Sequence, residues 1–247
     1  MIILDLKQGS NEWKVWRELG LGASDAPVIM GVSPWTSPFQ LWLEKTGLGK
    51  RPKANQWQQE AMDRGNKLEP EVRRRFEVMM GLEFPPLVGY LEGHPEIRAS
   101  FDGYNKDLKC LIEIKCPGKI DHSKAVKGKV PDKYYPQLQH QFLVSGATHG
   151  YYISFDGVDS LVVVNVFPDL YYMTNLKSQL VNFWKGVQSK TMPAAAHKDL
   201  QNLMKNGLDS LENIKNVFSM LGALLGVKVS EESANAVSAD EEGLIKV

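Results

Sequence analysis

Cysteine and long apolar runs are scarce in this chain of 247 residues. Its two cysteines, Cys110 and Cys116, are too few for a disulfide framework or for a zinc site built from paired thiolates. No apolar run approaches the ~18 residues that a membrane-spanning helix needs. The first residues carry neither the basic region nor the cleavage site of a signal peptide. These absences predict a cytoplasmic protein without a membrane segment.

An excess of charge of one sign is also missing, since 29 basic residues balance 29 acidic residues. A net charge of zero argues against a generally basic nucleic-acid-binding protein. The charge is nevertheless uneven, because residues 1–198 carry +4 and residues 199–247 carry −4. One basic cluster is equally compatible with a solvated loop and with a contact to a DNA backbone. Its members are Lys119, Lys124, Lys127, Lys129 and Lys133.

Helical and strand patterns alternate along most of the chain. Apolar spacing and capping residues predict helices over 9–19, from Ser24, from Ser37-Pro38 to Gly47, and over 56–80, 134–146 and 169–190. Pro70 suits a first helical turn, so we expect a break near Gly65. Strands are predicted over 87–91, 97–102, 109–116, 151–155 and 160–166. This order predicts an α/β (α+β) fold with a mixed central sheet flanked by helices.

The last fifty residues differ in character. Residues 198–226 have an apolar stripe of helical period, and residues 229–243 have the polar, acidic composition of a solvated tail. We therefore expect a main domain over residues 1–197 and a helical appendage with an acidic tail over residues 198–247. The appendage would either dock a partner protein, cover a subunit edge or pack on its own domain.

The most specific chemistry lies between residues 100 and 117. Asp102 ends one predicted strand, and Glu113-Ile114-Lys115 lies on the next. Because residues two apart on a strand share a face, Glu113 and Lys115 point the same way. Two carboxylates and an ammonium group suit metal-assisted hydrolysis of a phosphodiester. Asp102, Glu113 and the Ile114 carbonyl would hold Mg²⁺. Lys115 would position or deprotonate the attacking water, or stabilise the pentavalent phosphate.

Taken alone, this pattern has simpler explanations. Asp102-Gly103 is a common hairpin turn, and Glu113 with Lys115 could be the solvated face of a strand. Four motifs taken together are more specific. They are Arg17 seven residues before Ser24, Gly65 four before Glu69, Ser100-Phe101-Asp102-Gly103 followed by Glu113-Ile114-Lys115-Cys116-Pro117, and Tyr134 three before Gln137.

These motifs, in this order over about residues 9–170, resemble those of the lambda-exonuclease-like (YqaJ-type) viral recombinases of the PD-(D/E)xK nuclease superfamily. Phe101 departs from the family pattern, which commonly has Pro before the aspartate, and we expect little effect. The resemblance implies a restriction-endonuclease-like core. It places Glu69 at a second metal ion or its water, and it makes Gln137 a buttress of the site. It assigns the 5′-terminal phosphate of DNA to three residues, Arg17, Ser24 and Ser100.

The resemblance also implies the activity. The chain would be a Mg²⁺-dependent 5′→3′ exonuclease, with one or two ions and Mn²⁺ as an alternative. It would digest linear double-stranded DNA with 5′-phosphorylated ends and leave 3′ single strands for recombination by strand annealing. A homotrimer, a single-strand annealing partner and a bacterial or phage-infected host cell are implied in the same way.

Alternatives stay open for the residues and for the function. Glu69 could be a first-turn acid of a helix, Arg17 a surface ion-pair partner, and Ser24 a helix cap. The chain could be a structure- or sequence-specific DNA endonuclease of the same superfamily. It could also be a non-catalytic DNA-binding protein with a nuclease fold.

Overall fold

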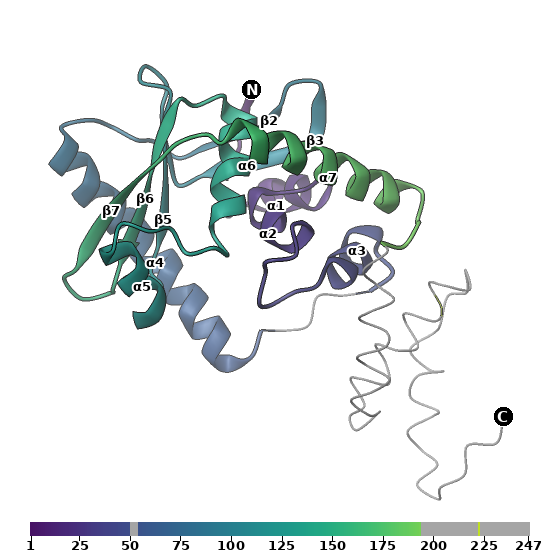
Figure 1. The fold of residues 1–247 in the computed structure, drawn as a ribbon, viewed down its shortest axis with the longest axis horizontal. Coiled ribbons are helices and arrows are strands. Elements are labelled where there is room, and N and C mark those ends of the chain that lie inside the picture. The colour runs from purple at the N-terminus through teal and green to yellow at the C-terminus, as the bar shows by residue number, and fades with distance from the viewer. Residues whose placement is uncertain (50–53, 194–221, 223–247) are drawn as a thin grey trace, which may run out of the picture. The chain divides into compact units, whose positions relative to one another are not determined.

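The computed structural model describes residues 1–49, 54–193 and 222 (Figure 1). The chain divides into two compact units, Met1–Thr36 with Pro52–Trp184, and Ser37–Arg51 with Lys185–Val247. The predicted domain boundary at residues 197–198 lies outside the described residues and stays a prediction. All of the candidate site residues belong to the first unit.

Two sheets form the framework of the first unit. The antiparallel sheet has the order β1-β2-β3, with β1 at Ile2–Leu4, β2 at Leu87–Leu91 and β3 at His94–Phe101. The mixed sheet has the order β4-β5-β6-β7, with β4 at Gly103–Asn105, β5 at Cys110–Lys115, β6 at His149–Phe155 and β7 at Leu161–Val166. Asp102 is the single residue between β3 and β4, so it lies where the chain passes from one sheet to the other.

Strands β5 and β6 are parallel, whereas β4 and β7 pair with them antiparallel. A parallel pair needs a long crossover, and two helices supply it. They are α5 at Lys119–Val126 and α6 at Tyr135–Ser145. Helix α5 packs against β6 and β7, while α6 packs against β2, β3 and β5 (Figure 1). The crossover therefore brings α6 over the join between the two sheets.

The other helices of the first unit are set by their caps. Helix α1 (Asn11–Glu18) begins after Ser10, whose side chain accepts a hydrogen bond from the Trp13 N–H, and a 3₁₀ turn (η1, Ala23–Asp25) leads into α2 (Ala26–Ile29). Helix α4 (Gln56–Met80) begins at the capping box of Asn55 and ends at Gly81, which has the positive φ of 66° that glycine tolerates. Helix α7 (Leu170–Gln188) runs from the first unit into the second.

Most of the predicted elements are confirmed, one prediction is wrong and some elements were not predicted. Helix α4 continues past Gly65 and through Pro70, because two caps and the buried Val72 and Phe76 hold it although a proline removes one helical hydrogen bond. The basic cluster is partly helical, since α5 covers residues 119–126. The short strand β1 was not predicted. The α/β (α+β) class and the mixed sheet flanked by helices are confirmed, and the antiparallel sheet is an addition.

Two hydrophobic clusters pack against the strands that carry the candidate site residues. The first is built around Leu21, Ile97, Phe101, Leu111, Leu138, Phe142 and Tyr152. The second is built around Val72, Phe76, Phe84, Ile112, Ile114 and Phe155, and it joins α4 to β5 and β6. Strand β5 contributes to both clusters, so the strand that carries Glu113 and Lys115 is fixed on both of its faces.

In the second unit, α3 (Pro38–Thr46) starts and stops where the sequence predicts. Ser37 and Gln40 form a capping box, and Gly47 ends the helix with a φ of 70°. The Trp42 indole N–H donates to the Gly186 carbonyl at 3.2 Å, which ties α3 to the end of α7 within this unit. Among the helices that the structure describes, we find none with the length and the apolar composition of a membrane span.

Candidate active site

Asp102 is held at the join between the two sheets. Its Oδ2 accepts a hydrogen bond of 2.7 Å from the Ile114 N–H on β5. The Asp-Gly dipeptide alone would allow a hairpin turn here. In the structure Gly103 instead begins β4. A Cβ on Gly103 would lie 2.5 Å from the Phe84 carbonyl oxygen, so only glycine fits this close approach. Glycine therefore allows β4 to pass close to the backbone of Phe84. The Asp102 carboxylate points to β5.

Glu113 is the most enclosed carboxylate of the site, with 1% of its surface exposed. Lys115 Nζ lies 2.6 Å from its Oε1, which confirms that the two side chains share a face of β5. Gln137 Nε2 donates to the same Oε1 at 2.5 Å. Gln141 Nε2 donates to Oε2 at 2.6 Å. Each carboxylate oxygen thus has its own amide donor, and both donors come from α6.

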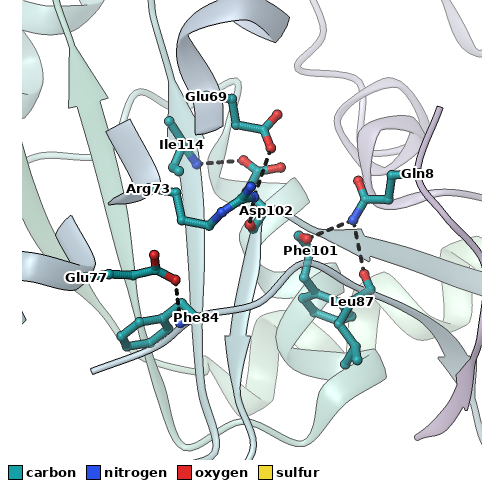
Figure 2. A network of polar contacts seen from close by, with 9 residues as sticks. All are labelled: Gln8, Glu69, Arg73, Glu77, Phe84, Leu87, Phe101, Asp102 and Ile114. Carbon is teal, nitrogen blue, oxygen red and sulfur yellow. Dashed lines mark hydrogen bonds and ion pairs between the residues drawn. The ribbon is translucent and has the colours of Figure 1, made fainter. Parts of the chain in front are cut away.

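Helix α4 brings Glu69 to the same place through Arg73. The Arg73 guanidinium lies 3.4 Å from Glu69 Oε1 and donates to the Asp102 carbonyl oxygen at 2.7 Å. Figure 2 shows the Glu69 carboxylate and the Asp102 side chain on the same side of Arg73. Figure 2 also shows Gln8, whose amide donates to the carbonyl oxygens of Leu87 and Phe101 and so joins β2 to the end of β3. The name acid group is used below for three acids together with the lysine beside them: Asp102, Glu113, Glu69 and Lys115.

Burial and neighbouring charges shift the pKa values of the acid group. Burial, followed by the charges of Glu113 and Glu69, raises the pKa of Asp102 well above its usual range, although Lys115 and the Ile114 N–H oppose the shift. Burial also raises the pKa of Glu69, and Arg73 opposes this shift while Glu113 adds to it. Three carboxylates thus share this place with the cations of Lys115 and Arg73.

The pKa of Lys115 is also raised, and for a lysine this favours the charged form. Burial alone would lower the pKa of Lys115, but the carboxylates of Glu113 and Asp102 outweigh it and raise the pKa above its usual value. The ammonium group also lies 5.6 Å from the centre of the Tyr134 ring, within the range of a cation–π contact. Lys115 is consequently a fixed positive charge at neutral pH.

The donor chemistry of the acid group fits a hard divalent cation. Its ligands would all be oxygens, and a cation would offset both the burial of Asp102 and the neighbouring charges of Glu113 and Glu69, which together raise the pKa of Asp102. Within the part of the chain that the structure describes, however, no three His, Cys, Asp or Glu side chains are gathered into a ready metal site. Glu113 instead faces Lys115 and the two amides. Metal binding by Asp102, Glu113, Glu69 and the Ile114 carbonyl stays a prediction.

The residues predicted to hold a terminal phosphate form a second set, called the phosphate group below: Arg17, Ser24 and Ser100. Arg17 Nη2 donates to Ser24 Oγ at 2.6 Å. Ser24 lies within the 3₁₀ turn and is exposed, so it is not a helix cap, and Gly22 and Asp25 hold those positions.

Trp13 connects Ser100 to this pair. Its indole N–H donates to Ser100 Oγ at 2.8 Å, and the Arg17 guanidinium lies 5.1 Å from the centre of its ring. The phosphate group is therefore assembled around one tryptophan.

Sequence reasoning missed two residues of this site. Neither Trp13 nor Gln141 was singled out as a site residue. The signal for Gln141 was available, because it follows Gln137 by four residues and so lies on the same helical face. Gln139, by contrast, bonds the Phe167 carbonyl and the Asp169 N–H and does not face the acids.

Part of the basic cluster is paired within the chain, and Lys133 faces the Tyr134 ring that Lys115 also contacts. Lys133 pairs with Asp121 at 2.6 Å and lies 4.6 Å from the centre of the Trp35 ring. Lys124 lies 3.9 Å from the same Asp121. Two members are thus partly neutralised within the chain, and contact of the cluster with DNA stays a prediction.

Three comparisons bear on what such a site is. Residues 12–148 match the family model of the YqaJ-like viral recombinase domain, a range that contains both the acid group and the phosphate group. A curated relative, the uncharacterized protein YqaJ of Bacillus subtilis (strain 168), is 33% identical over 139 residues, which is 55% of this chain and 42% of the relative. The match thus spans less than half of the length of that relative.

Solved structures share the fold. An alkaline exonuclease, LHK-Exo of Laribacter hongkongensis, superposes with a TM-score of 0.58 at 25% identity and covers 74% of this chain and 94% of its own. The same enzyme in complex with dAMP gives a TM-score of 0.58 at 24% identity, covering 80% and 100%. A phage-related exonuclease from Haemophilus somnus 129PT, at 14% identity and a TM-score of 0.54, covers 69% and 94% and supports the fold alone.

Proposed function

The chain belongs to the YqaJ-like viral recombinase family, and from this membership and the geometry of its site we propose that it is a Mg²⁺-dependent 5′→3′ exonuclease of linear double-stranded DNA. One observation carries the proposal. Within the matched range, the buried Glu113 carboxylate is held by Lys115 and by two amides, one residue away from the backbone that binds Asp102. Burying a charged carboxylate costs free energy, so a purely structural role does not explain why acids are concentrated in this way.

Asp102, Glu113 and Glu69 would hold the cation, together with the Ile114 carbonyl. When bound, Mg²⁺ would supply a water of lowered pKa and neutralise charge on the scissile phosphate. Mn²⁺ has the same preference for oxygen ligands and is the alternative ion. The remaining chemistry belongs to the side chains of the chain itself.

Lys115 stabilises charge in this proposal. Its ammonium group lies 2.6 Å from the Glu113 carboxylate. From there it can offset the negative charge that the phosphate gains during attack. Gln137 donates to one oxygen of the Glu113 carboxylate and so contributes to holding it in place.

The phosphate group gives the proposed direction. Arg17 can bind a terminal phosphate through its planar guanidinium, and Ser24 and Ser100 supply hydroxyl groups. Anchoring the 5′ phosphate would place the first internucleotide bond at the acid group, and cleavage would release a 5′-mononucleotide. The structure of LHK-Exo with dAMP, which is such a nucleotide, supports this product.

Strand removal from 5′ ends leaves 3′ single strands, so we place the enzyme before a strand-annealing step of recombination. Its partners would be duplex ends with 5′ phosphates, two further copies of the chain in a trimer, and a single-strand annealing protein. The reaction would take place in the cytoplasm of a bacterial or phage-infected cell.

The test compares four substrates with the wild-type chain and Mg²⁺. They are linear duplexes with 5′-phosphoryl ends, the same duplexes with 5′-hydroxyl ends, nicked circles and closed circles. We expect mononucleotide release from the 5′ strand of the phosphorylated duplex and no cutting of the closed circle. Cutting of the closed circle would instead establish the endonuclease alternative, and Mg²⁺-independent binding without products would establish the non-catalytic one.

A further inference from the structure

Gln141 contacts both strands that carry the site. Its Nε2 donates to Glu113 Oε2 on β5 at 2.6 Å and lies 3.4 Å from the Ser100 carbonyl oxygen on β3. Ser100 and Glu113 come from different sheets, and the Oγ of Ser100, a member of the phosphate group, also accepts from the Trp13 indole. One amide group of α6 therefore spans the join where Asp102 lies.

The other end of this amide is unusual. Gln141 has none of its surface exposed, and its Oε1 has no hydrogen-bond partner among the described residues. A buried oxygen without a partner destabilises a folded protein, whereas an apolar side chain of the same size would avoid that loss. The amide is consequently explained by what its nitrogen does, which is to hold Glu113.

Gln137 alone does not fix Glu113. Its amide and the Lys115 ammonium both act on Oε1, so this oxygen has two donors. Oε2 has Gln141. Without the Gln141 donor, the carboxylate could rotate about its last torsion and turn Oε2 away from its present direction. The two glutamines thus fix the plane of the carboxylate, which neither fixes by itself.

We propose that Gln141 is a positioning residue that sets the orientation of the Glu113 carboxylate for cation binding and turnover. This inference rests on the proposed function, in which Glu113 is a metal ligand. Hydrogen-bond partners behind metal ligands typically change metal affinity or activity by about 10–100-fold when they are removed. Gln141 belongs to this class.

The variant Gln141→Met keeps the length and the apolar body of the side chain and removes the donor. We expect kcat on 5′-phosphorylated duplex to fall about 10–100-fold and the Mg²⁺ concentration for half-maximal rate to rise by a similar factor, with a much smaller change in KM for DNA ends. The variant Gln141→Glu has nearly the same shape but cannot donate when ionised, so it should lose at least as much.

Gln139→Met is the matched control. Gln139 lies on the same helix, is also fully buried and makes its hydrogen bonds to main-chain groups of residues 167 and 169. We expect this variant to lose stability, as any buried hydrogen-bonded glutamine would, and to keep the metal dependence of the wild-type chain. Urea unfolding of all three variants separates loss of fold from loss of positioning.

Direct metal binding gives a second measurement without DNA. Free Mn²⁺ is titrated with each protein and followed by its electron paramagnetic resonance signal. Weaker Mn²⁺ binding by folded Gln141→Met than by Gln139→Met supports the inference, and equal binding with equal turnover overturns it. If the wild-type chain degrades no DNA, the proposed function fails, while the Mn²⁺ titration still decides the role of Gln141.

Discussion

The acid group and the phosphate group belong to one unit and have opposite designs. The acid group brings three carboxylates together around the buried Glu113, and donors fix two of them, three on the Glu113 carboxylate and one on the Asp102 carboxylate. The phosphate group is half-exposed, carries one positive charge on Arg17 and is assembled around the ring of Trp13.

The difference separates two tasks. A buried carboxylate with fixed partners suits a step in which charges must be in place beforehand. A partly exposed arginine beside hydroxyl groups suits recognition of an anion that arrives from solvent. If this comparison is right, damage to the acid group should slow the reaction on every DNA end. Damage to the phosphate group should change only which ends are used.

The largest effect is expected for Lys115→Ala. Loss of the fixed positive charge should lower kcat about 10²–10³-fold, equally on 5′-phosphoryl and 5′-hydroxyl ends. Steady-state rates on the two substrates measure this. The control is Arg74→Ala, which removes one positive charge from an exposed ion pair on α4 and should keep its activity. A Lys115→Ala effect confined to phosphorylated ends would contradict the comparison.

The second effect is on stability and concerns α6, the helix whose two amides bind Glu113. His140 on α6 lies 2.8 Å from the Arg98 carbonyl on β3 through Nε2, and its Nδ1 has no partner among the described residues. Burial lowers its pKa from 6.5 to about 4, against the opposing effects of the Arg98 carbonyl and Asp25. The folded protein therefore favours neutral His140.

The sign follows from linkage. The contribution of neutral His140 to stability is complete above pH 6.5 and is lost as the pH falls from there to about 4, because only the unfolded chain binds the proton in that interval. The loss in unfolding free energy is about 3 kcal/mol. His140→Gln, which cannot titrate, should lack this part of the pH dependence in urea unfolding. Parallel curves for wild type and variant would refute the assignment.

A third change tests the phosphate group. Arg17→Ala should lower kcat/KM on 5′-phosphoryl ends about 10–100-fold, because a hydrogen bond to a charged partner contributes roughly 1.5–3 kcal/mol. Rates on 5′-hydroxyl ends should stay close to those of the wild-type chain. A competition assay with both ends in one reaction reports the ratio directly, and an unchanged ratio would show that Arg17 does not recognise the phosphate.

The smallest effect is expected for Trp13→Phe. The ring that faces Arg17 is kept, and the N–H that binds Ser100 is lost. One neutral hydrogen bond contributes about 1 kcal/mol, so the preference for phosphorylated ends should fall roughly fivefold. The same competition assay measures it, with Trp57→Phe on the exposed face of α4 as the control. A loss of preference larger than that of Arg17→Ala would contradict this expectation, because Trp13 would then do more than bind Ser100.

The sequence predicts an element correctly where that element depends on residues close by in the chain. Helix α3 begins at Ser37-Pro38 and ends at Gly47 because capping and glycine conformations depend only on neighbouring residues. The break predicted near Gly65 failed because tertiary packing of Val72 and Phe76 decides whether a proline is tolerated within a helix. Strand β1 exists only through its pairing with β2, about ninety residues away, and no local pattern reports that.

The candidate site shows the same limit. Glu113 and Lys115 were placed on one face from their spacing, and the 2.6 Å contact confirms it. The contact of Trp13 with Ser100 joins residues 87 positions apart, so no spacing rule could predict it. The roles assigned to the site residues stay predictions, since they depend on what binds there.

The single residue between β3 and β4 makes this part of the chain intolerant to changes of length. Side chains alternate along a strand, so one residue inserted between Phe101 and Asp102 would turn the carboxylate toward the opposite face. The turn at residues 106–109 carries no such constraint and can lengthen. Natural relatives should therefore differ in the number of residues in this turn and agree on the number from Ile97 to Asp102.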